Sequence, residues 1–319
     1  MRTLKYVLKR LLFLVITFFV ILTITFCLIK TLQSDVPLGA QGQTELARRE
    51  ALGWNKPILV QYGIYLRNLI TKFDIGTSLK VSYMSPVADV IWERLPPTVL
   101  VNVLSILLGL PLGIALGIFA ALKKNTWIDH VISVIIVIFI SVPSFVLAFF
   151  LQYFLSFKLG WFPLTMYSKA DAGGLLTWKM IYSLMLPIMA SAFYEIAYFA
   201  RTIRAELTEA LTSDYMLLAR TKGLTQAKAV TRHALKNAMV PILPVVIGTF
   251  LSVMGGSMVL ERIFAIPGVG DLTLKALSQL DYDLFVGTSM FYTLIGLLAG
   301  ILTDLSYGFL DPRIKMGER

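Results

Sequence analysis

Few side chains of this sequence could carry out chemistry by themselves. Cys27 is the only cysteine and His130 and His233 are the only histidines, so neither a disulfide framework nor a Cys/His zinc cluster is expected. Asp281 and Asp283 lie close together, but no His or Cys is near them in the sequence, and we expect no metal there. The sequence has no Gly-x-x-x-x-Gly-Lys-Ser/Thr phosphate loop, so any ATP would have to bind to a partner.

The segment 201–238 has the most informative spacing of residue types. It predicts a short helix that Ser213 or Asp214 can cap, a left-handed break at Gly223, and a second helix that Thr225 caps. A helix–glycine–helix unit presents a rigid surface to a partner protein. Docking is therefore the favoured interpretation of this segment, and an amphipathic surface loop is the alternative.

The composition indicates that the helices carrying these residues belong to a membrane protein. Of the 319 residues, 57% are hydrophobic and 15% are charged, whereas about 25% are charged in an ordinary soluble domain. Too few charges are present to cover a soluble protein of this size. The formal net charge of +10 would suggest nucleic acid in a soluble protein, but in a membrane protein it reports which loops stay in the cytoplasm. We expect no nucleic-acid partner.

Six apolar stretches are long enough to cross a bilayer, because a hydrocarbon core about 30 Å thick needs about 20 helical residues. They lie at 11–29, 97–122, 131–157, 181–200, 239–260 and 284–309. The first stretch is longer than the apolar part of a signal peptide and lacks a small-x-small cleavage site, so we expect it to be retained. The prediction is an all-α integral membrane protein with six transmembrane helices.

Charge asymmetry predicts the orientation. Six spans place both termini on one side, and that side carries 16 Lys and Arg residues against five in the short loops of the other side. The positive-inside rule then makes both termini cytoplasmic. The predicted parts are a first helix with an extracytoplasmic lobe (1–96), a five-helix core (97–309) with the cytoplasmic loop 201–238, and a cytoplasmic tail (310–319).

Two acidic residues stand in apolar surroundings. Glu195 lies inside the fourth predicted span near Tyr198, and an ionisable group in a membrane suggests function by default. It could have such a role, but a hydrogen bond between helices or an ion pair with Arg201 is the favoured interpretation. A turn is predicted on the external face after the fifth span, from Glu261, Pro267, Gly268 and Gly270. It forms either a re-entrant or gate element at the outer mouth or a simple tight turn.

The segment 201–238 resembles the membrane permease subunits of type I ABC importers, specifically the B-type subunit of oligopeptide and dipeptide permeases. Ala219, Gly223 and Leu235 match the family's cytoplasmic signature. Three positions depart from the general pattern of Glu, Ala and Pro: Leu217, Leu218 and Lys236. The peptide-permease version of the signature is matched at Tyr215, Ala219, Lys222, Gly223, Leu224, His233, Leu235, Asn237 and Ala238.

The likeness covers nearly the whole chain. Blocks similar to the family are DIGTSL at 74–79, LPPTVLVN at 95–102, AALKKNTWID at 120–129, SVPSFVLAFFLQYFLSFKLGWFP at 141–163, LERIFAIPGVGDL at 260–272 and TDLSYGFLDPRIK at 303–315. Each block is short, and their order and coverage together make the resemblance specific.

The resemblance implies a non-catalytic transport subunit in a bacterial cell membrane. Its expected partners are a homologous C-type permease, two ATPase subunits that bind ATP and Mg²⁺, an extracytoplasmic peptide-binding protein and the lipid bilayer. This chain itself would bind no cofactor. The expected ATPase-coupling residues are Asp214, Tyr215, Leu218, Ala219, Arg220, Lys222, Gly223 and Leu224, and Glu195 and Tyr198 are candidates for the translocation path. Oligopeptides or dipeptides are the expected substrates, and nickel chelates, glutathione or sugars are the alternatives within the family.

Two other classes of function were weighed. A secondary transporter or channel that works alone would be expected to carry several intramembrane charges, and only Glu195 is well inside a span. An intramembrane serine protease needs Gly-x-Ser-Gly and a His at membrane depth. The nearest match, at Gly255–Met258, lacks the last Gly, and neither His lies in a predicted span.

Overall fold

The computed structural model describes residues 2–31 and 42–310 of the chain. The elements of the first half are α1 (Arg2–Thr31), α2 (Gly42–Ala51), α3 (Ile58–Lys72), β1 (Thr77–Ser78), β2 (Ser85–Pro86), α4 (Val87–Leu122), α5 (Trp127–Ser141), α6 (Ser144–Leu151) and the π-helix η1 (Gln152–Lys158). Those of the second half are α7 (Lys169–Ala172), α8 (Trp178–Ser183), α9 (Met185–Leu211), α10 (Asp214–Thr221), α11 (Gln226–Ala229), the π-helix η2 (Val230–Ala234), α12 (Leu235–Met239), α13 (Ile242–Leu251), the 3₁₀ turn η3 (Ser252–Met254), α14 (Met258–Ile263), α15 (Val269–Ser278) and α16 (Tyr282–Leu310).

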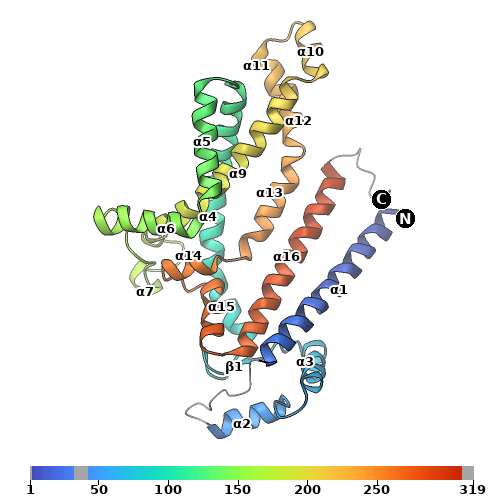
Figure 1. Ribbon diagram of the computed structural model, residues 1–319, viewed down its shortest axis with the longest axis vertical. Coiled ribbons are helices and arrows are strands. Elements are labelled where there is room, and N and C mark those ends of the chain that lie inside the picture. The colour runs from blue at the N-terminus through green and yellow to red at the C-terminus, as the bar shows by residue number, and fades with distance from the viewer. Residues whose placement is uncertain (1, 32–41, 311–319) are drawn as a thin grey trace.

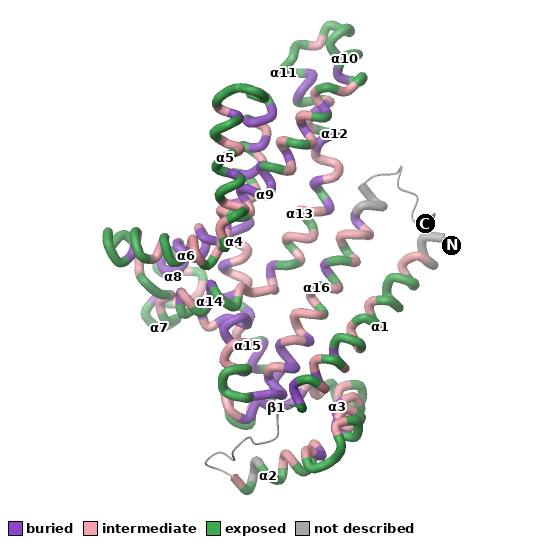
Figure 2. Tube along the Cα trace, in the orientation of Figure 1, coloured by how far each residue is buried: buried purple, intermediate pink, exposed green. Residues whose placement is uncertain are grey.

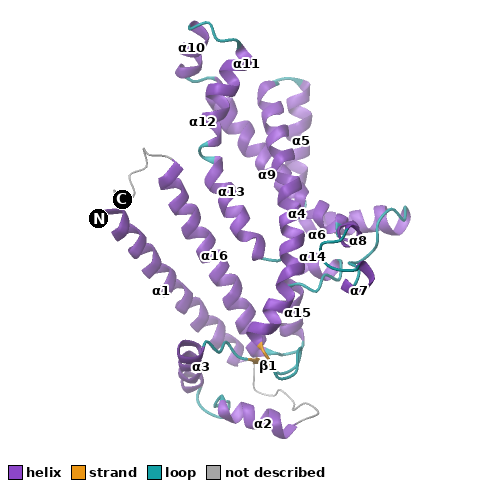
Figure 3. Cartoon of the chain, turned by 180° about the vertical axis from the view of Figure 1, so that it is seen from behind, coloured by secondary structure: helices purple, strands orange, loops and turns teal. Residues whose placement is uncertain are grey.

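The long helices form an elongated bundle in which α1 and α16 run side by side (Figure 1). The start of α1 and the end of α16 lie near each other, as the views from the front and from behind both show (Figures 1 and 3). α10 and α11 project at one end of the bundle, and α2 and α3 lie at the other. The two short strands pair antiparallel, with Thr77 opposite Pro86.

The apolar helices agree in part with the six predicted spans. Within residues 2–31 and 42–310, three helices are long and apolar enough to cross a membrane alone, namely α1, α4 and α16. Two bent helix pairs bring the number to five if each pair is one span. The stretch 181–200, the fourth predicted span, falls on α8 and α9, which are not among these five. The all-helical membrane architecture is confirmed, and the number six stays a prediction.

The third predicted span, 131–157, is wrong as a straight helix. α5 meets the helix formed by α6 and η1 at an angle of 101°. The bend follows from Pro143, because a proline ring disfavours the helical conformation of the residue before it. Val142 is accordingly extended, with φ −79° and ψ 122°. α6 therefore leaves the bundle sideways (Figure 1).

The fifth predicted span, 239–260, is also interrupted. The helix that ends with α12 meets the helix that begins with α13 at 53°. Pro241 stands at this bend, where its ring and missing N–H disrupt the helical hydrogen bonds. The span then stops at Met254, and α14 starts as a separate helix at Met258.

A ladder of glycines brings α4 and α9 into close contact. Gly109, Gly113 and Gly117 recur every four residues and therefore lie on one face of α4. A Cβ added to Gly113 would lie 2.8 Å from Phe199 Cβ and 2.9 Å from the carbonyl oxygen of Ile196. The backbones can approach this closely only because the glycines have no side chain, which is the usual way in which membrane helices associate.

Two ion pairs join α1 to α16 near their two ends. Arg10 Nη1 lies 2.8 Å from Asp304 Oδ2, and Lys30 Nζ lies 3.4 Å from Asp283 Oδ1. Arg10 and Lys30 are 20 residues apart, which corresponds to about 30 Å of helix, the thickness of a hydrocarbon core. The pairs therefore mark the two ends of an apolar span. Between them α1 leaves much of its surface exposed, as expected for a helix that faces lipid (Figure 2).

Two buried carboxylates tie segments together at the end opposite to α10. Asp281 Oδ2 accepts hydrogen bonds from Ser78 Oγ at 2.6 Å and from three successive backbone N–H groups, those of Leu79, Lys80 and Val81. The segment after β1 is thereby held against the start of α16. Buried charge needs such partners to be tolerated.

The second buried carboxylate is that of Glu261, which connects α14 to α4 and α15. Thr98 Oγ1 donates to Glu261 Oε1 at 2.8 Å, and the backbone N–H of Asp271 donates to Oε2 at 2.9 Å. Gly268 and Gly270 allow the chain to pass close to this carboxylate. The stretch 261–270 is therefore a hydrogen-bonded junction of three helices and not a simple tight turn.

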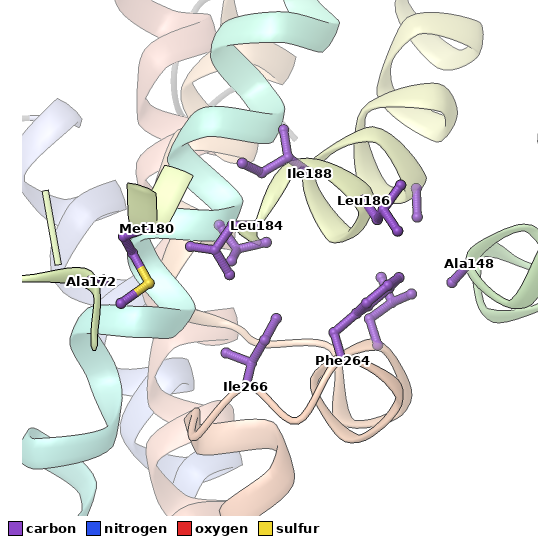
Figure 4. Packing of buried hydrophobic residues seen from close by; sticks show 11 residues of the cluster. Ala148, Ala172, Met180, Leu184, Leu186, Ile188, Phe264 and Ile266 are labelled. Atoms are coloured by element: carbon purple, nitrogen blue, oxygen red, sulfur yellow. The ribbon is translucent and has the colours of Figure 1, made fainter. Parts of the chain in front are cut away.

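An apolar cluster next to this junction fixes the start of α9. Its buried side chains come from α4, α6, α7, α8, α9 and α14, from Leu184 between α8 and α9, and from the segment that follows α14. Leu184, Leu186 and Ile188 lie close to Phe264 and Ile266 in this cluster (Figure 4). α9 is thus anchored in this cluster at its start, while its other end leads to α10.

The glycine ladder generates the first prediction. Gly113→Ala forces α4 and α9 apart, because neither Phe199 Cβ nor the Ile196 carbonyl oxygen can move independently of α9. We expect a loss of about 1–3 kcal/mol in stability, the usual cost of overpacking, measured as a lower thermal midpoint of the purified protein in detergent. Gly300→Ala on α16 is the matched control, because nothing lies within 4 Å of its added Cβ. Equal thermal midpoints for the two variants would contradict the close contact between the glycines of α4 and α9.

Candidate functional site

The candidate site is the unit formed by α10 and α11 at the projecting end of the bundle (Figure 1). α9 ends at Leu211, two residues form a turn, and α10 occupies Asp214–Thr221. The predicted short helix is therefore confirmed to within one residue of its end. The second predicted helix is present as α11, η2 and α12, which follow one another without a gap from Gln226 to Met239.

Gly223 forms the break between the two helices, as predicted. Its φ is +83°, in the left-handed region that glycine adopts without a steric penalty. The N–H of Leu224 donates to the carbonyl oxygen of Ala219 at 3.3 Å, which is the long hydrogen bond of a glycine-terminated helix. A Cβ added to Gly223 would meet nothing within 4 Å, so only the backbone conformation selects glycine here.

The predicted N-cap positions of Ser213 and Thr225 are confirmed, but neither side chain makes the capping hydrogen bond. Ser213 stands at the N-cap of α10, but its hydroxyl donates at 2.6 Å to the carbonyl oxygen of Ala210 and accepts no helix N–H. The hydroxyl closes the last turn of α9 instead. Asp214 is the first residue of α10 and not its cap, and Thr225 makes no side-chain hydrogen bond to α11. Both helices therefore depend on packing more than on capping.

Small buried residues pack α10 against its neighbours. Met216 and Ala219 are the buried residues of α10, and Leu224 packs against the same cluster. The other buried members come from α4, α9, α11, η2 and α12: Ala121, Leu207, Ala210, Ala229, Val230, Ala234 and Ala238. Since most of these side chains are alanines, the helices lie close together and the unit is rigid.

The opposite side of α10 is exposed and partly apolar. Leu217 is 65% exposed and Leu218 is 56% exposed, and Tyr215 is also exposed. The predicted contact residues Asp214, Arg220 and Lys222 are exposed as well. A hollow of about 200 Å³ adjoins this surface; it is lined by Glu206, Glu209, Ala210, Ser213, Tyr215, Asn237 and Ala238.

The structure therefore divides the predicted coupling residues into two groups. Ala219, Gly223 and Leu224 shape the unit, and the exposed residues form its surface. Leu217 was not among the predicted contacts, although it is the most exposed large apolar residue of α10. The spacing of the buried Met216 and Ala219 could have revealed it, because Leu217 points away from both on a helix.

Glu195 and Tyr198 lie in the middle of α9, far from α10. Gly109 faces Glu195, whose Cβ would be 2.6 Å from an added Cβ at the glycine. No ion pair with Arg201 and no hydrogen bond of the Glu195 carboxylate is present among the described residues, so the favoured structural interpretation is wrong for them. Tyr198 is exposed and stacks on Tyr194, with 6.3 Å between ring centroids.

The acidic pair near α16 has partners within the chain. Asp281 accepts the backbone hydrogen bonds described above, and Asp283 pairs with Lys30. Within the described residues, no group of three or more His, Cys, Asp or Glu side chains is arranged to hold a metal ion.

Comparison with protein families covers almost the whole chain. Residues 113–316 match the family described as binding-protein-dependent transport system inner membrane component. Residues 3–102 match the family described as the N-terminal part of binding-protein-dependent transport system membrane components.

Individual relatives are similar over their full length. The chain is 34% identical to the dipeptide transport system permease protein of Bacillus subtilis (strain 168), with 99% of both chains covered. It is 35% identical to a putative peptide transport system permease protein of Brucella abortus (strain 2308), covering 97% of this chain and 98% of the relative. It is also 32% identical to the glutathione transport system permease protein of Escherichia coli O6:H1 (strain CFT073), covering 98% and 99%.

A solved structure has a similar fold. The crystal structure of an amino acid ABC transporter with histidines superposes with a TM-score of 0.52 at 20% identity, covering 70% of this chain and 94% of that chain. This likeness concerns the fold alone, and the families and full-length relatives carry the assignment. The chain belongs to the binding-protein-dependent transport system inner membrane components, the multi-pass permease subunits of ABC transporters in bacterial cell membranes.

Proposed function

We propose that this chain is the B-type permease subunit of an ATP-driven importer that takes up oligopeptides or dipeptides. The observation that carries the proposal is α10, a short rigid helix with an exposed face at the projecting end of the bundle. The dipeptide and peptide permeases among its full-length relatives support the substrate class. Glutathione, which is itself a small peptide, is the alternative that one relative supports.

In this proposal the projecting end is cytoplasmic. The excess of Lys and Arg on the side of the termini and of the 201–238 loop supports that orientation. α10 would then sit in a groove of an ATPase, with Leu217 and Leu218 as its apolar contacts. The buried alanines hold α10 against α11 and η2, and η2 and α12 in turn pack on α9, so a movement of the ATPase would be passed on to the bundle.

The proposed assembly contains a homologous C-type permease and two ATPases, with an extracytoplasmic peptide-binding protein on the other side. ATP and Mg²⁺ would bind to the ATPases, since this sequence has no phosphate loop. The chain itself would bind no cofactor and catalyse no reaction. Glu195 and Tyr198 are proposed to line the translocation path, because the Glu195 carboxylate has no partner among the described residues and Tyr198 is exposed.

The left-handed break generates a prediction about coupling. Gly223→Val strains the backbone at φ +83° and should misplace α10. We expect the ATPases to be lost on purification and peptide uptake to be abolished, while the amount of chain in the membrane is unchanged. Reversing the exposed charges at Arg220 and Lys222 should have the same effect without backbone strain.

Matched controls separate coupling from general damage. Gly173→Val creates the same strain at φ +76° in similarly open surroundings, but outside the α10 unit. Lys228→Glu reverses an exposed charge on α11. Both controls should keep uptake. Full uptake by the Gly223 and Arg220/Lys222 variants would overturn the assignment of α10.

The translocation path generates a separate prediction for Glu195. Glu195→Gln keeps the shape of the side chain and removes its charge, and no ion pair among the described residues is lost, so the thermal midpoint should not change. Uptake of a peptide with a free amino terminus should fall about fivefold, the factor that corresponds to about 1 kcal/mol of charge attraction in a hydrated path. Radiolabelled peptide uptake measures this effect. Unchanged uptake, or a lowered thermal midpoint, would contradict the proposal that Glu195 lines the translocation path.

The subunit composition is the most direct prediction. Purification of the chain from its native membrane in mild detergent should recover two ATPase subunits and one homologous permease, which quantitative mass spectrometry can count. The same preparation should transport peptide only when the binding protein and ATP are supplied after reconstitution. A chain that purifies alone, or only with itself, would instead support a transporter or channel that works without partners.

A further inference from the structure

We infer that α3 lies in the outer leaflet of the bilayer, with its outward face in contact with lipid. α3 belongs to the segment between α1 and α4 that the sequence predicts to be an extracytoplasmic lobe. It lies beside the lower end of α1, on the side away from α16, in both the front and the rear view (Figures 1 and 3). It is therefore at the periphery of the bundle, where lipid surrounds a membrane protein.

Contacts with α1 determine how deep α3 lies. The hydroxyls of Tyr62 and Thr23 are 2.6 Å apart. Thr23 is seven residues before Lys30, the end of the apolar span, which places it about 10 Å inside that end along the helix. The ring of Phe26, one turn nearer to Lys30 than Thr23 is, packs against the rings of Tyr62 and Tyr65, with 5.2 and 5.1 Å between ring centroids.

A contact with α16 gives the same depth. The Tyr65 hydroxyl donates to the sulfur of Met290 at 2.9 Å. Met290 is eight residues after Tyr282, the first residue of α16, which is about 12 Å along that helix. Two neighbouring helices therefore show independently that α3 packs against apolar spans. A helix in the aqueous phase would not reach these levels.

The apolar surface of α3 is wider than the part that α1 and α16 cover. Tyr62, Tyr65 and Leu69 face the bundle. Leu59 is 79% exposed and Ile70 is 63% exposed, and they lie on the same side of the helix because they are eleven residues apart. Phe73, directly after the helix, is 86% exposed. This exposed apolar strip lies at the depth of acyl chains.

The polar residues of α3 are placed as in an interfacial helix. Arg67 and Thr71 lie on the side of the helix opposite to the bundle, where Val60 is also exposed, and Lys72 ends the helix. Arg67 borders the apolar strip, because it is three residues before Ile70. Long basic side chains near a membrane surface extend their charges to the phosphates of the headgroups. A helix with one apolar side and basic residues at its polar edge lies in the plane of the interface. Lipid therefore fits this surface better than a water-soluble binding protein does.

Quenching of a fluorescent probe tests the position of α3. Cys27→Ala removes the native thiol, and single cysteines are then introduced as Leu59→Cys and Ile70→Cys on the apolar strip. Thr71→Cys, on the neighbouring residue of the polar side, is the matched control, and Glu50→Cys on α2 is the aqueous reference. All four positions are exposed, so the labelled variants should fold. An environment-sensitive maleimide labels each variant in the complete transporter, reconstituted in phosphatidylcholine–phosphatidylglycerol nanodiscs.

Nitroxides on the acyl chains should quench the probes at positions 59 and 70 at least about twice as strongly as those at 71 and 50, and iodide in the water should show the reverse order. Introducing Leu59→Glu together with Ile70→Cys should raise iodide access at position 70, because the charge draws this side of the helix toward water. Equal iodide access at positions 70 and 50 would overturn the inference. Protection of position 70 from both quenchers would also overturn it, because a protein partner would then cover the strip.

Discussion

Close packing of α9 on the glycine face of α4 is the constraint on which the rest of the structure depends. The shortest distance from an added Cβ to α9 is 2.6 Å at Gly109 and 2.8 Å at both Gly113 and Gly117, so the two backbones can lie this near only because these positions have no side chain. Without a hydrophobic driving force between helices in lipid, such contact is a main source of association. α9 runs without a break from the apolar cluster around Phe264 to the residues that pack under α10. A single continuous helix thus connects the apolar cluster around Phe264 with the α10 unit.

Buried polar contacts fix the remaining helices around this pair. Asp281 binds a run of backbone N–H groups from the segment after β1, and Glu261 binds Thr98 of α4 and the start of α15. Each carboxylate joins segments that are far apart in the sequence. Hydrogen bonds of this kind are directional, so they determine the relative position of the helices as well as their proximity. α1 contributes two ion pairs and little close packing with small residues, which is consistent with its place at the edge of the bundle.

The sequence was sufficient to predict what depends on local chemistry. The apolar stretches, the helix–glycine–helix unit and the left-handed Gly223 all follow from composition, periodicity and the conformational freedom of glycine. Pro143 and Pro241 are visible in the sequence as sites where a span can kink, but only the structure shows how sharply the helices bend there, by 101° and 53°. Ser213 and Thr225 stand at the predicted N-cap positions, but their capping hydrogen bonds do not form, because a side-chain hydroxyl has several backbone partners available. The glycine ladder is visible in the sequence as a four-residue spacing, but only the structure shows which helix it meets.

The α10 unit distinguishes residues that shape the helix from residues that contact a partner. Ala219 and Gly223 match the general family signature. Ala219 is buried on the inner side of α10, and Gly223 adopts the left-handed conformation after the helix. The three positions that depart from that signature, Leu217, Leu218 and Lys236, are all exposed. A substitution at a buried or left-handed position would disturb the helix itself, whereas an exposed position can change with the surface that it meets. The departures therefore fit a proposed ATPase groove that is more apolar opposite α10 than the general signature implies, and the specificity of subunit pairing would then reside at Leu217 and Leu218.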